Sequence, residues 1–440
     1  MSKGRKDLPG SAAPGPPARS LVYDWGQHQD PRQLPAQAGD QGLESRQPAS
    51  VALNDETLRD GLQSSSVRTP SPGEKIELLH CMVALGIDRV NIGMPVAGAR
   101  ASSDSALLAQ EVVTAGLDLE TACAARTVKG DIEAVAEVVQ RAGHGVVADC
   151  FIGSSPIRQH LQGWDLDYLL RCTGEAVTYA RSLGLEVMFV TEDTVRAKPQ
   201  HVARLYLEAV RAGARAVCVT DTVGAATPEG AAELVRFLHR ELAAADCAVP
   251  VDWHGHNDRG LAVANSLAAA RAGAHRLHGT GLGIGERAGN AAMDQLLVNF
   301  RLEGWGQRDL ESLPRYCRLV SRSMEVPIPS SYPVLGEDAF RTATGVHAAA
   351  LLKARRRGQQ ELEDLVYSSI PASLVGRRQR VDIGPSSGVA NVNYWLTARG
   401  LEAPEATVAK ILERAKSADR VLGEDEVRAL LPRAEAGGGG

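Results

Sequence analysis

The chain alternates short apolar runs with longer amphipathic segments, and this alternation limits the folds that it can adopt. Eight runs have the length and the β-branched content of strands, at 51–54, 87–92, 117–123, 146–152, 185–190, 214–220, 249–254 and 277–280. Between them lie segments with the apolar spacing of helices, for example 72–85, 128–141, 166–183, 198–212, 228–244 and 261–272. Several of these segments end just before a glycine, which is a helix-stop signal.

Eight strand–helix units in succession predict an α/β fold, a closed (β/α)8 TIM barrel over residues 47–305. A doubly wound open sheet is the alternative, and the regular repetition favours closure. From 306 onward helical segments continue while strands become scarce, which predicts a smaller, mainly helical C-terminal subdomain over 306–436. Residues 1–46 are predicted to be a disordered arm, and the glycines at 437–440 a flexible tail.

The composition excludes several classes of protein. Hydrophobic residues make up 44% and charged residues 23%, as in soluble globular proteins, and a net charge of −5 argues against a nucleic-acid partner. No apolar run reaches the roughly 18 residues of a membrane span, and the N-terminus lacks the apolar core of a secretory signal. Seven cysteines without CxxC spacing are predicted to be buried free thiols, which indicates the cytoplasm.

Polar residues and glycines follow the predicted strands, where a barrel carries its chemistry. The first strand is followed by DETLRDGLQ at 55–63, the fourth by GSSPIR at 153–158, and the fifth by Thr191-Glu192-Asp193. The seventh ends in HGHND at 254–258, and the eighth leads into the glycine-rich segment 281–290. Because all these segments follow strands, we expect them at one face of the barrel.

The segment His254-Gly255-His256 places two imidazoles on the same side of a strand. Two imidazoles and a carboxylate suit a divalent metal, and the spacing leaves Asp55 and Asp60 both open as the carboxylate. Strand eight alone separates strand seven from strand one in a closed barrel, so either acid is within reach. A structural role for the histidines in capping a strand is the alternative.

The glycines at 281–290 have a spacing like that of a dinucleotide-binding motif, but they follow the last strand and do not open a first βαβ unit. Gly283 and Gly285 therefore predict close backbone approach to a ligand, or else a tight turn.

The segments at 55–63 (DETLRDGLQ), 254–257 (HGHN) and 283–290 (GIGERAGN) resemble signature segments of the DRE-TIM metallolyase superfamily. The most similar branch contains the 2-isopropylmalate, homocitrate and citramalate synthases, and the resemblance spans about 51–400. It implies a barrel that binds a divalent cation (Mn, Mg, Co or Zn) through Asp60, His254 and His256, with Asn290 as a further ligand or neighbour.

The resemblance also implies roles in a Claisen condensation of acetyl-CoA with a 2-oxo acid, an acyltransferase reaction. Arg59 would polarise the carbonyl group, and Gln63 and Thr222 would bind the oxo acid. Glu192 would act as the base, with His347 and Tyr367 contributed by the other subunit of a homodimer. Gly283 and Gly285 are assigned to the binding of acetyl-CoA.

A lyase on the same scaffold is the alternative reaction. The related hydroxymethylglutaryl-CoA lyases carry a cysteine in the loop after strand eight, which segment 281–290 lacks. That absence and the presence of His347 favour condensation.

Two departures from the synthase pattern concern the oxo acid. Asn91 stands where most synthases have a glutamate, and Arg158 in GSSPIR resembles the homocitrate synthases. An arginine at this position favours a doubly anionic oxo acid, such as oxaloacetate, 2-oxoglutarate, phosphonopyruvate or phosphinopyruvate. The chain could accordingly be a phosphinomethylmalate or phosphonomethylmalate synthase or a Re-type citrate synthase. A 2-isopropylmalate synthase that uses 2-oxoisovalerate is the alternative, and Arg158 could instead face solvent or a CoA phosphate.

Overall fold

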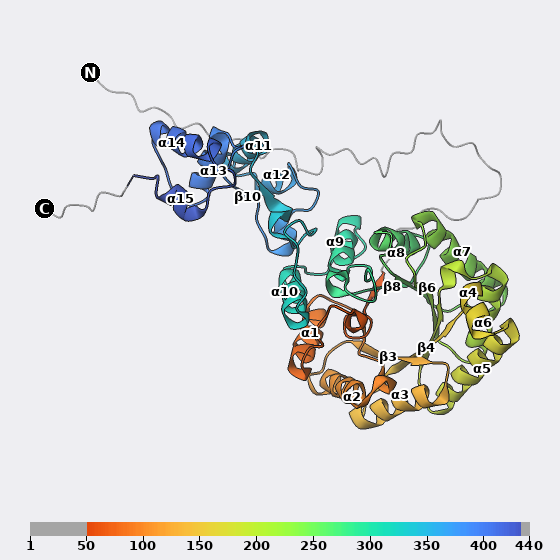
Figure 1. Ribbon diagram of the computed structural model, residues 1–440. Helices are drawn as coiled ribbons and strands as arrows, with labels where there is room; N and C mark the ends of the chain where they lie inside the picture. Colours follow the sequence, from red (N-terminus) through yellow and green to blue (C-terminus); the bar gives the residue numbers. More distant parts are fainter. Residues whose placement is uncertain (1–50, 433–440) are drawn as a thin grey trace, which may run out of the picture. The chain divides into compact units, whose positions relative to one another are not determined.

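A computed structural model describes residues 51–432 as two compact units. The first comprises 51–339 with 374–376 and contains the barrel (Figure 1), and the second comprises 340–373 with 377–432. The barrel unit thus continues past 305 to 339, and the helix Leu313–Met324 packs onto the barrel within this stretch. The predicted arm and the glycine tail lie outside the described residues.

Eight parallel strands form the closed barrel in chain order, as predicted, and β1 pairs with β8 to complete the ring. The strands are β1 (Ala52–Asp55), β2 (Arg89–Asn91), β3 (Glu120–Arg126), β4 (Val147–Gly153), β5 (Val187–Glu192), β6 (Ala216–Asp221), β7 (Val251–Gly255) and β8 (Arg276–Gly279). The ends of each strand lie within three residues of those of a predicted apolar run. The pairing of β1 with β8 excludes the open-sheet alternative.

Helices surround the barrel, as Figure 1 shows. They are α1 (Pro72–Ala84), α2 (Ala99–Thr114), α3 (Lys129–Ala142), α4 (Pro156–Gln162), α5 (Leu166–Ser182), α6 (Pro199–Arg211), α7 (Pro228–Ala244), α8 (Ala262–Arg271), α9 (Met293–Glu303) and α10 (Leu313–Met324). Short 3-10 helices follow several strands: η3 (Gly61–Gln63), η4 (Pro95–Ala97), η5 (Thr194–Arg196) and η6 (Gly281–Gly283).

Local sequence signals explain where several helices begin. The side chain of Ser71 accepts from the backbone N–H of Glu74, whose carboxylate accepts from Ser71 in return, and Pro72 occupies the first turn of α1. The side chain of Thr227 caps α7 by accepting from the backbone N–H of Gly230, again with a proline next in sequence. These caps satisfy N–H groups that a helix leaves unpaired and so fix the length of each loop after a strand.

The second unit is mainly helical, as predicted. It contains α11 (Gly345–Arg356), α12 (Gln360–Leu365), α13 (Val389–Thr397), α14 (Glu405–Lys416) and α15 (Glu424–Arg428), with a two-stranded pairing of β9 (Arg341–Thr342) and β10 (Arg380–Val381). Two further 3-10 helices, η7 (Glu337–Phe340) and η8 (Ala372–Val375), lie where the chain passes between the units. The second unit has its own buried core, which includes Val392, Ile411 and Val427.

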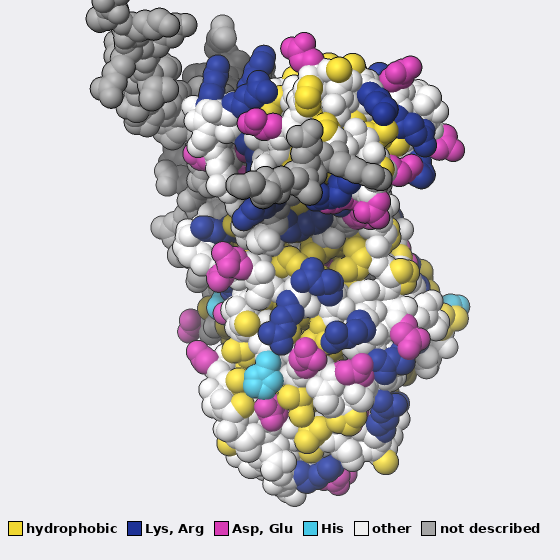
Figure 2. All heavy atoms as spheres, turned by 90° about the vertical axis from the view of Figure 1, so that its left-hand side faces the viewer, with side chains coloured by type: hydrophobic (Ala, Val, Ile, Leu, Met, Phe, Trp, Pro, Cys, Tyr) yellow, Lys and Arg dark blue, Asp and Glu magenta, His cyan; other side chains and the backbone are white. Residues whose placement is uncertain are grey.

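Within residues 51–432, no helix is long and apolar enough to cross a membrane. On the face of the molecule in Figure 2, basic and acidic side chains are interspersed among apolar ones. All seven cysteines are free; five are buried, while Cys172 and Cys247 are only half-buried.

Helix α10 is joined to the barrel by a buried hydroxyl group. Tyr316 Oη donates to Asp55 Oδ2 at 2.5 Å and lies 3.1 Å from Thr57 Oγ1, which accepts from the N–H of Gly281 at 2.8 Å. The end of β1, the loop after β8 and α10 are therefore hydrogen-bonded together. Burial raises the pKa of Asp55 to about 6, despite these donors.

We expect Tyr316→Phe to lower the free energy of unfolding by about 1–3 kcal/mol, because the buried carboxylate of Asp55 loses a donor. Urea unfolding followed by circular dichroism measures the change. The matched control is Tyr179→Phe, since the hydroxyl group of Tyr179 donates to Glu133 at the protein surface. Equal effects of the two substitutions would show that the Tyr316 bond contributes nothing specific.

Candidate active site

A cavity of about 440 Å³ lies within the barrel and contains residues from the carboxyl ends of the strands. It has the size of a small-molecule site. Seven of the residues predicted from sequence line it: Arg59, Asp60, Gln63, Glu192, Thr222, His254 and His256. The segments that follow these strands therefore meet at one cavity, as expected from the sequence.

Asp60, His254 and His256 form a compact, buried group. The two Nε2 atoms lie 3.3 Å apart, and Asp60 Oδ2 lies 3.7 Å from His254 Nε2 and 3.6 Å from His256 Nε2. Their possible ligand atoms all lie within 4.8 Å of one another. Asp55, the other acid that the spacing left open, is instead hydrogen-bonded to Tyr316 and Thr57.

The charge states of this group suit a cation. Burial would raise the pKa of Asp60, but Arg59, His254 and His256 outweigh it, so the pKa is lowered and the carboxylate is charged. Burial and the adjacent His256 lower the pKa of His254 to about 3, so its imidazole is neutral. A carboxylate beside a neutral imidazole is the protonation state that binds a divalent metal.

Asn290 completes the group on the side of the loop after β8. Its Nδ2 donates to Asp60 Oδ1 at 2.8 Å, while its Oδ1 is buried without a hydrogen-bond partner. A buried amide oxygen without a donor is costly unless something else coordinates it. This unpaired buried oxygen and the facing imidazole nitrogens are therefore suited to coordinate a divalent cation.

Gly283 and Gly285, which are predicted to approach a ligand closely, also lie close to the neighbouring residues of the protein. A Cβ atom on Gly285 would lie 2.1 Å from Asn290 Nδ2 and 2.7 Å from Asp60 Oδ1, and one on Gly283 would lie 3.1 Å from Asn290 O. Gly285 also has φ +151°, which favours glycine. Both glycines therefore let the loop fold against the candidate metal ligands.

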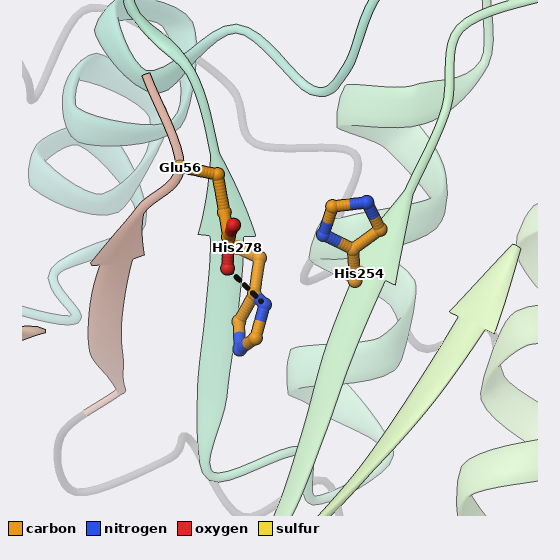
Figure 3. A group of neighbouring side chains, drawn as sticks. All are labelled: Glu56, His254 and His278. Atoms are coloured by element: carbon orange, nitrogen blue, oxygen red, sulfur yellow. Dashed lines mark ion pairs between the residues drawn. The ribbon is translucent and has the colours of Figure 1, made fainter. Parts of the chain in front are cut away.

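A second group of potential ligands shares His254 (Figure 3). Glu56 Oε1 lies 3.3 Å from His278 Nδ1, and Asp252 Oδ2 lies 3.3 Å from His278 Nε2. Burial would lower the pKa of His278, but Asp252 and Glu56 raise it above its ordinary value. His278 is therefore already paired on both nitrogens, which makes this group a poorer metal site.

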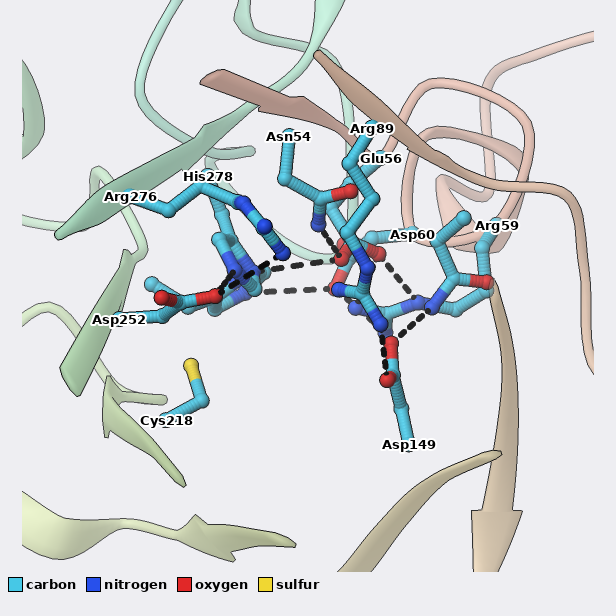
Figure 4. A network of polar contacts seen from close by, with 12 residues as sticks. Asn54, Glu56, Arg59, Asp60, Arg89, Asp149, Cys218, Asp252, Arg276 and His278 are labelled. Atoms are coloured by element: carbon cyan, nitrogen blue, oxygen red, sulfur yellow. Dashed lines mark hydrogen bonds and ion pairs between the residues drawn. The ribbon is translucent and has the colours of Figure 1, made fainter. Parts of the chain in front are cut away.

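The barrel interior continues this pattern of paired charges (Figure 4). The side chain of Arg89 is fully buried and forms ion pairs with Asp149 and Glu120, while Arg276 pairs with Asp252 and Glu120. Asn91, the departure noted in the sequence, donates to Asp149 Oδ2 at 3.1 Å and lines the cavity. These interactions neutralise charges that burial would otherwise make very costly.

Arg59 lies between the two groups. Its Nε donates to Glu56 Oε2 at 2.7 Å and its Nη1 to Asp60 Oδ2 at 3.0 Å. Burial would lower the pKa of Arg59, but Glu56 and Asp60 raise it, so the guanidinium stays charged. A fixed cation thus lines the cavity beside the candidate metal ligands.

Glu192 and Thr222 lie at the ends of neighbouring strands. The carboxylate of Glu192 lines the cavity, and its Oε1 lies 3.4 Å from Arg158 Nε. Arg158 is in the first turn of α4 with its side chain 41% exposed; it does not line the cavity itself and contacts it through Glu192. Thr222 Oγ1 accepts from the backbone N–H of Asp193 at 2.8 Å.

His347 and Tyr367 belong to the second unit and lie together there. Their rings stack with centroids 3.8 Å apart, and Thr342 Oγ1 lies 3.4 Å from His347 Nδ1. Tyr367 is 46% exposed and the adjacent Val346 is 75% exposed. Two residues 20 positions apart in sequence are thus paired on an accessible surface of their unit.

Several cavity residues were not predicted from the sequence. They are Glu56, Asp149, Cys218, Thr220, His278, Glu286 and Arg287, among others. His278 carried a signal, because a histidine interrupts a predicted apolar strand, and Glu56 lies inside the first motif. An acid within a strand, such as Asp149, gave no signal in the sequence, because its partner Arg89 is far away along the chain.

Comparison with known proteins identifies the family of this chain. The profile of the HMGL-like family matches residues 50–320, so the chain belongs to the HMGL-like family. It is 33% identical to the homocitrate synthase AksA of Methanopyrus kandleri over 87% of this chain and 90% of that protein. It is 32% identical to the (R)-citramalate synthase CimA of Methanocaldococcus jannaschii, over 83% and 70% respectively.

A 2-isopropylmalate synthase of Methylacidiphilum infernorum is 33% identical, over 82% of this chain and 70% of that protein. These relatives confirm the predicted resemblance to the condensing synthases of the superfamily. Among solved structures, the HMG-CoA lyase of Bacillus subtilis superposes with a TM-score of 0.52 at 20% identity, over 64% of this chain and 97% of that one. At that identity the likeness supports the barrel fold alone.

We expect a divalent cation such as Mn²⁺ to stabilise the protein by about 2.7 kcal/mol at a concentration of 100 Kd. Asp60→Asn and His254→Ala should each weaken cation affinity at least about tenfold, because the first removes the negative charge of a ligand and the second removes a ligand atom. Calorimetric titration of chelator-treated protein measures the affinity, with His239→Ala, a surface histidine that bonds Gly273 O, as the control. Loss of binding in His278→Asn but not in Asp60→Asn would place the cation at the second group instead.

Proposed function

We propose that the protein is an acyltransferase that condenses acetyl-CoA with a small 2-oxo acid in a metal-dependent Claisen reaction. One observation carries the proposal. The Asp60–His254–His256 group, the charged Arg59 and the carboxylate of Glu192 line a single cavity in a chain whose relatives are named homocitrate, citramalate and 2-isopropylmalate synthases. The products would be a 2-substituted malate and CoA.

Asp60, His254, His256 and Asn290 would hold the divalent cation, which supplies a Lewis acid for the oxo group of the substrate. Arg59 is fixed by Glu56 and Asp60, so its guanidinium can stabilise negative charge on the same oxygen without reorienting. The hydroxyl group of Thr222 and the amide of Gln63 would bind the carboxylate of the oxo acid.

Glu192 would accept a proton from the methyl group of acetyl-CoA. The resulting carbanion forms a carbon–carbon bond with the oxo carbon, and water then cleaves the thioester and releases CoA. The loop that contains Gly283 and Gly285 is predicted to approach acetyl-CoA, although its close contacts within the chain are to Asp60 and Asn290. Cleavage of a carbon–carbon bond in the reverse sense is the alternative reaction.

The position of Arg158 supports a doubly anionic oxo acid. Its side chain is 41% exposed, and its Nε lies 3.4 Å from Oε1 of the cavity-lining Glu192, its one ion-pair partner among the described residues. A second anionic group on the substrate could therefore reach it at modest desolvation cost. Oxaloacetate, 2-oxoglutarate, phosphonopyruvate and phosphinopyruvate carry such a group.

A panel of oxo acids tests this proposal by release of free CoA thiol in the presence of Mn²⁺ or Mg²⁺. We expect turnover with at least one doubly anionic acid, and a fall in kcat/KM of about tenfold or more in Arg158→Ala, because a charged hydrogen bond is worth about 1.5–3 kcal/mol. Arg171→Ala is the control, since Arg171 lies over Tyr168 on the outer helix α5. Preference for 2-oxoisovalerate would identify a 2-isopropylmalate synthase, and thiol release without any oxo acid would reject condensation.

We further propose that the protein acts as a homodimer in which His347 and Tyr367 assist the cavity of a second copy. Exposed apolar side chains support an interface on each unit: Val346, Val366 and Val389 in the second unit, and Ile157 and Leu161 on α4 at the rim of the barrel. Grouped exposed apolar side chains commonly mark an interface.

Mixing two inactive variants tests this arrangement. Glu192→Gln and His347→Ala should each abolish most turnover. The mixture of the two should regain up to about one quarter of wild-type activity, because about half of the dimers are mixed and each mixed dimer has one intact site of two. Thiol release after co-refolding measures the recovery. The control mixture pairs Glu192→Gln with Asp60→Asn. Both substitutions lie in the barrel unit, so each barrel of a mixed dimer carries one of them, and no activity should return. A sharing of His347 within one chain predicts no recovery in the first mixture.

A further inference from the structure

The residue after Glu192 has an unusual backbone conformation. Asp193 adopts left-handed dihedral angles, φ 60° and ψ 44°, and is 4% exposed. This region is unfavourable for residues with a side chain, although aspartate, asparagine and glycine tolerate it best. The turn redirects the chain at the end of β5, directly beside the proposed base.

Asp193 also links β5 to β6. Its backbone N–H donates to Thr222 Oγ1 at 2.8 Å, across the ends of the two strands. Its carboxylate accepts from Arg196 Nε at 2.9 and 3.0 Å and from Arg196 Nη2 at 2.6 Å. The same residue thus adjoins Glu192 in sequence and holds Thr222 in space.

This bond determines how Thr222 can meet a ligand. Thr222 Oγ1 accepts from Asp193 and lies 3.0 Å from Thr220 Oγ1, whose own hydroxyl group donates to the carbonyl oxygen of Thr191. The hydroxyl hydrogen of Thr222 is therefore left for Thr220 or for a ligand in the cavity. Toward that ligand Thr222 is a donor, which suits a carboxylate.

We propose that Asp193 is a positioning residue, whose left-handed backbone keeps the carboxylate of Glu192 and the donor hydroxyl of Thr222 in register around one 2-oxo acid. The inference rests on the proposed function, because it takes Glu192 and Thr222 as the groups that meet the substrates. It assigns the effect to the backbone of Asp193, and the ion pair with Arg196 secures that backbone.

Substitutions that differ in their tolerance of left-handed angles test the proposal. Asp193→Val should raise KM for the oxo acid and lower kcat, with kcat/KM falling about five- to thirtyfold, because left-handed backbone costs a residue with a side chain roughly 1–2 kcal/mol. Asp193→Gly and Asp193→Asn, which accept these angles, should stay within about threefold of wild type.

Two further variants separate this role from general stability. Asp246 has the same left-handed conformation, φ 55°, after the end of α7 and away from the cavity. Asp246→Val should lower the melting temperature without changing KM. Arg196→Gln removes the ion pair and keeps the turn, so its KM should change less than that of Asp193→Val. Equal losses of kcat/KM in Asp193→Gly and Asp193→Val, or in Arg196→Gln and Asp193→Val, would overturn the proposal.

Crystal structures of the Val and Gly variants give a result that does not depend on turnover. We expect the Asp193 N–Thr222 Oγ1 bond to be lost in Asp193→Val and kept in Asp193→Gly. An unchanged bond in both would refute the inference even if the enzyme is active. If the wild-type protein released no thiol with any oxo acid, the proposed function would fail, while these structures would still decide the role of the backbone.

Discussion

Closure of the barrel between β1 and β8 is the constraint on which the candidate site depends. Four residues of β1 pair in register with β8, and β8 pairs with β7 on its other side. Asp60 follows β1, whereas His254 and His256 follow nearly two hundred residues later. Only a closed ring brings these three side chains within 4 Å of one another, so the candidate metal site is a product of the topology as much as of the residues.

Burial within this ring then determines the charges. Glu56 and Asp60 are almost inaccessible to water, yet Arg59 contacts both, so the acids stay ionised and the guanidinium has no freedom to turn away. Similar pairs extend through the interior from Arg89 to Asp149 and from Arg276 to Asp252. Removing one member of such a pair leaves a buried charge without compensation, which costs far more than the pair itself contributes.

The sequence predicted the features that repeat or that lie close together along the chain. The eight strands were evident because buried parallel strands are apolar runs, and His254 and His256 because alternation along a strand puts them on one side. The interior ion pairs were not, since an inward-pointing acid in a strand has no local signature and its partner is far away in sequence. The packing of α10 onto the barrel was not predicted either, because an amphipathic pattern does not indicate against which core a helix packs. The left-handed turn at Asp193 was likewise invisible, as aspartate occurs there without a glycine to mark it.

The rim of the cavity offers unequal room for change. On the side of β8, Gly285 leaves no space for even a methyl group beside Asn290 and Asp60. On the side of β4, Arg158 and Ile157 project from a short helix with solvent around them. Substitutions are thus tolerated more easily on the β4 side, whereas a larger residue at Gly285 on the β8 side would clash with Asn290 and Asp60. A library directed at α4 would leave the candidate metal ligands in place, whereas one directed at the glycines would mainly displace them.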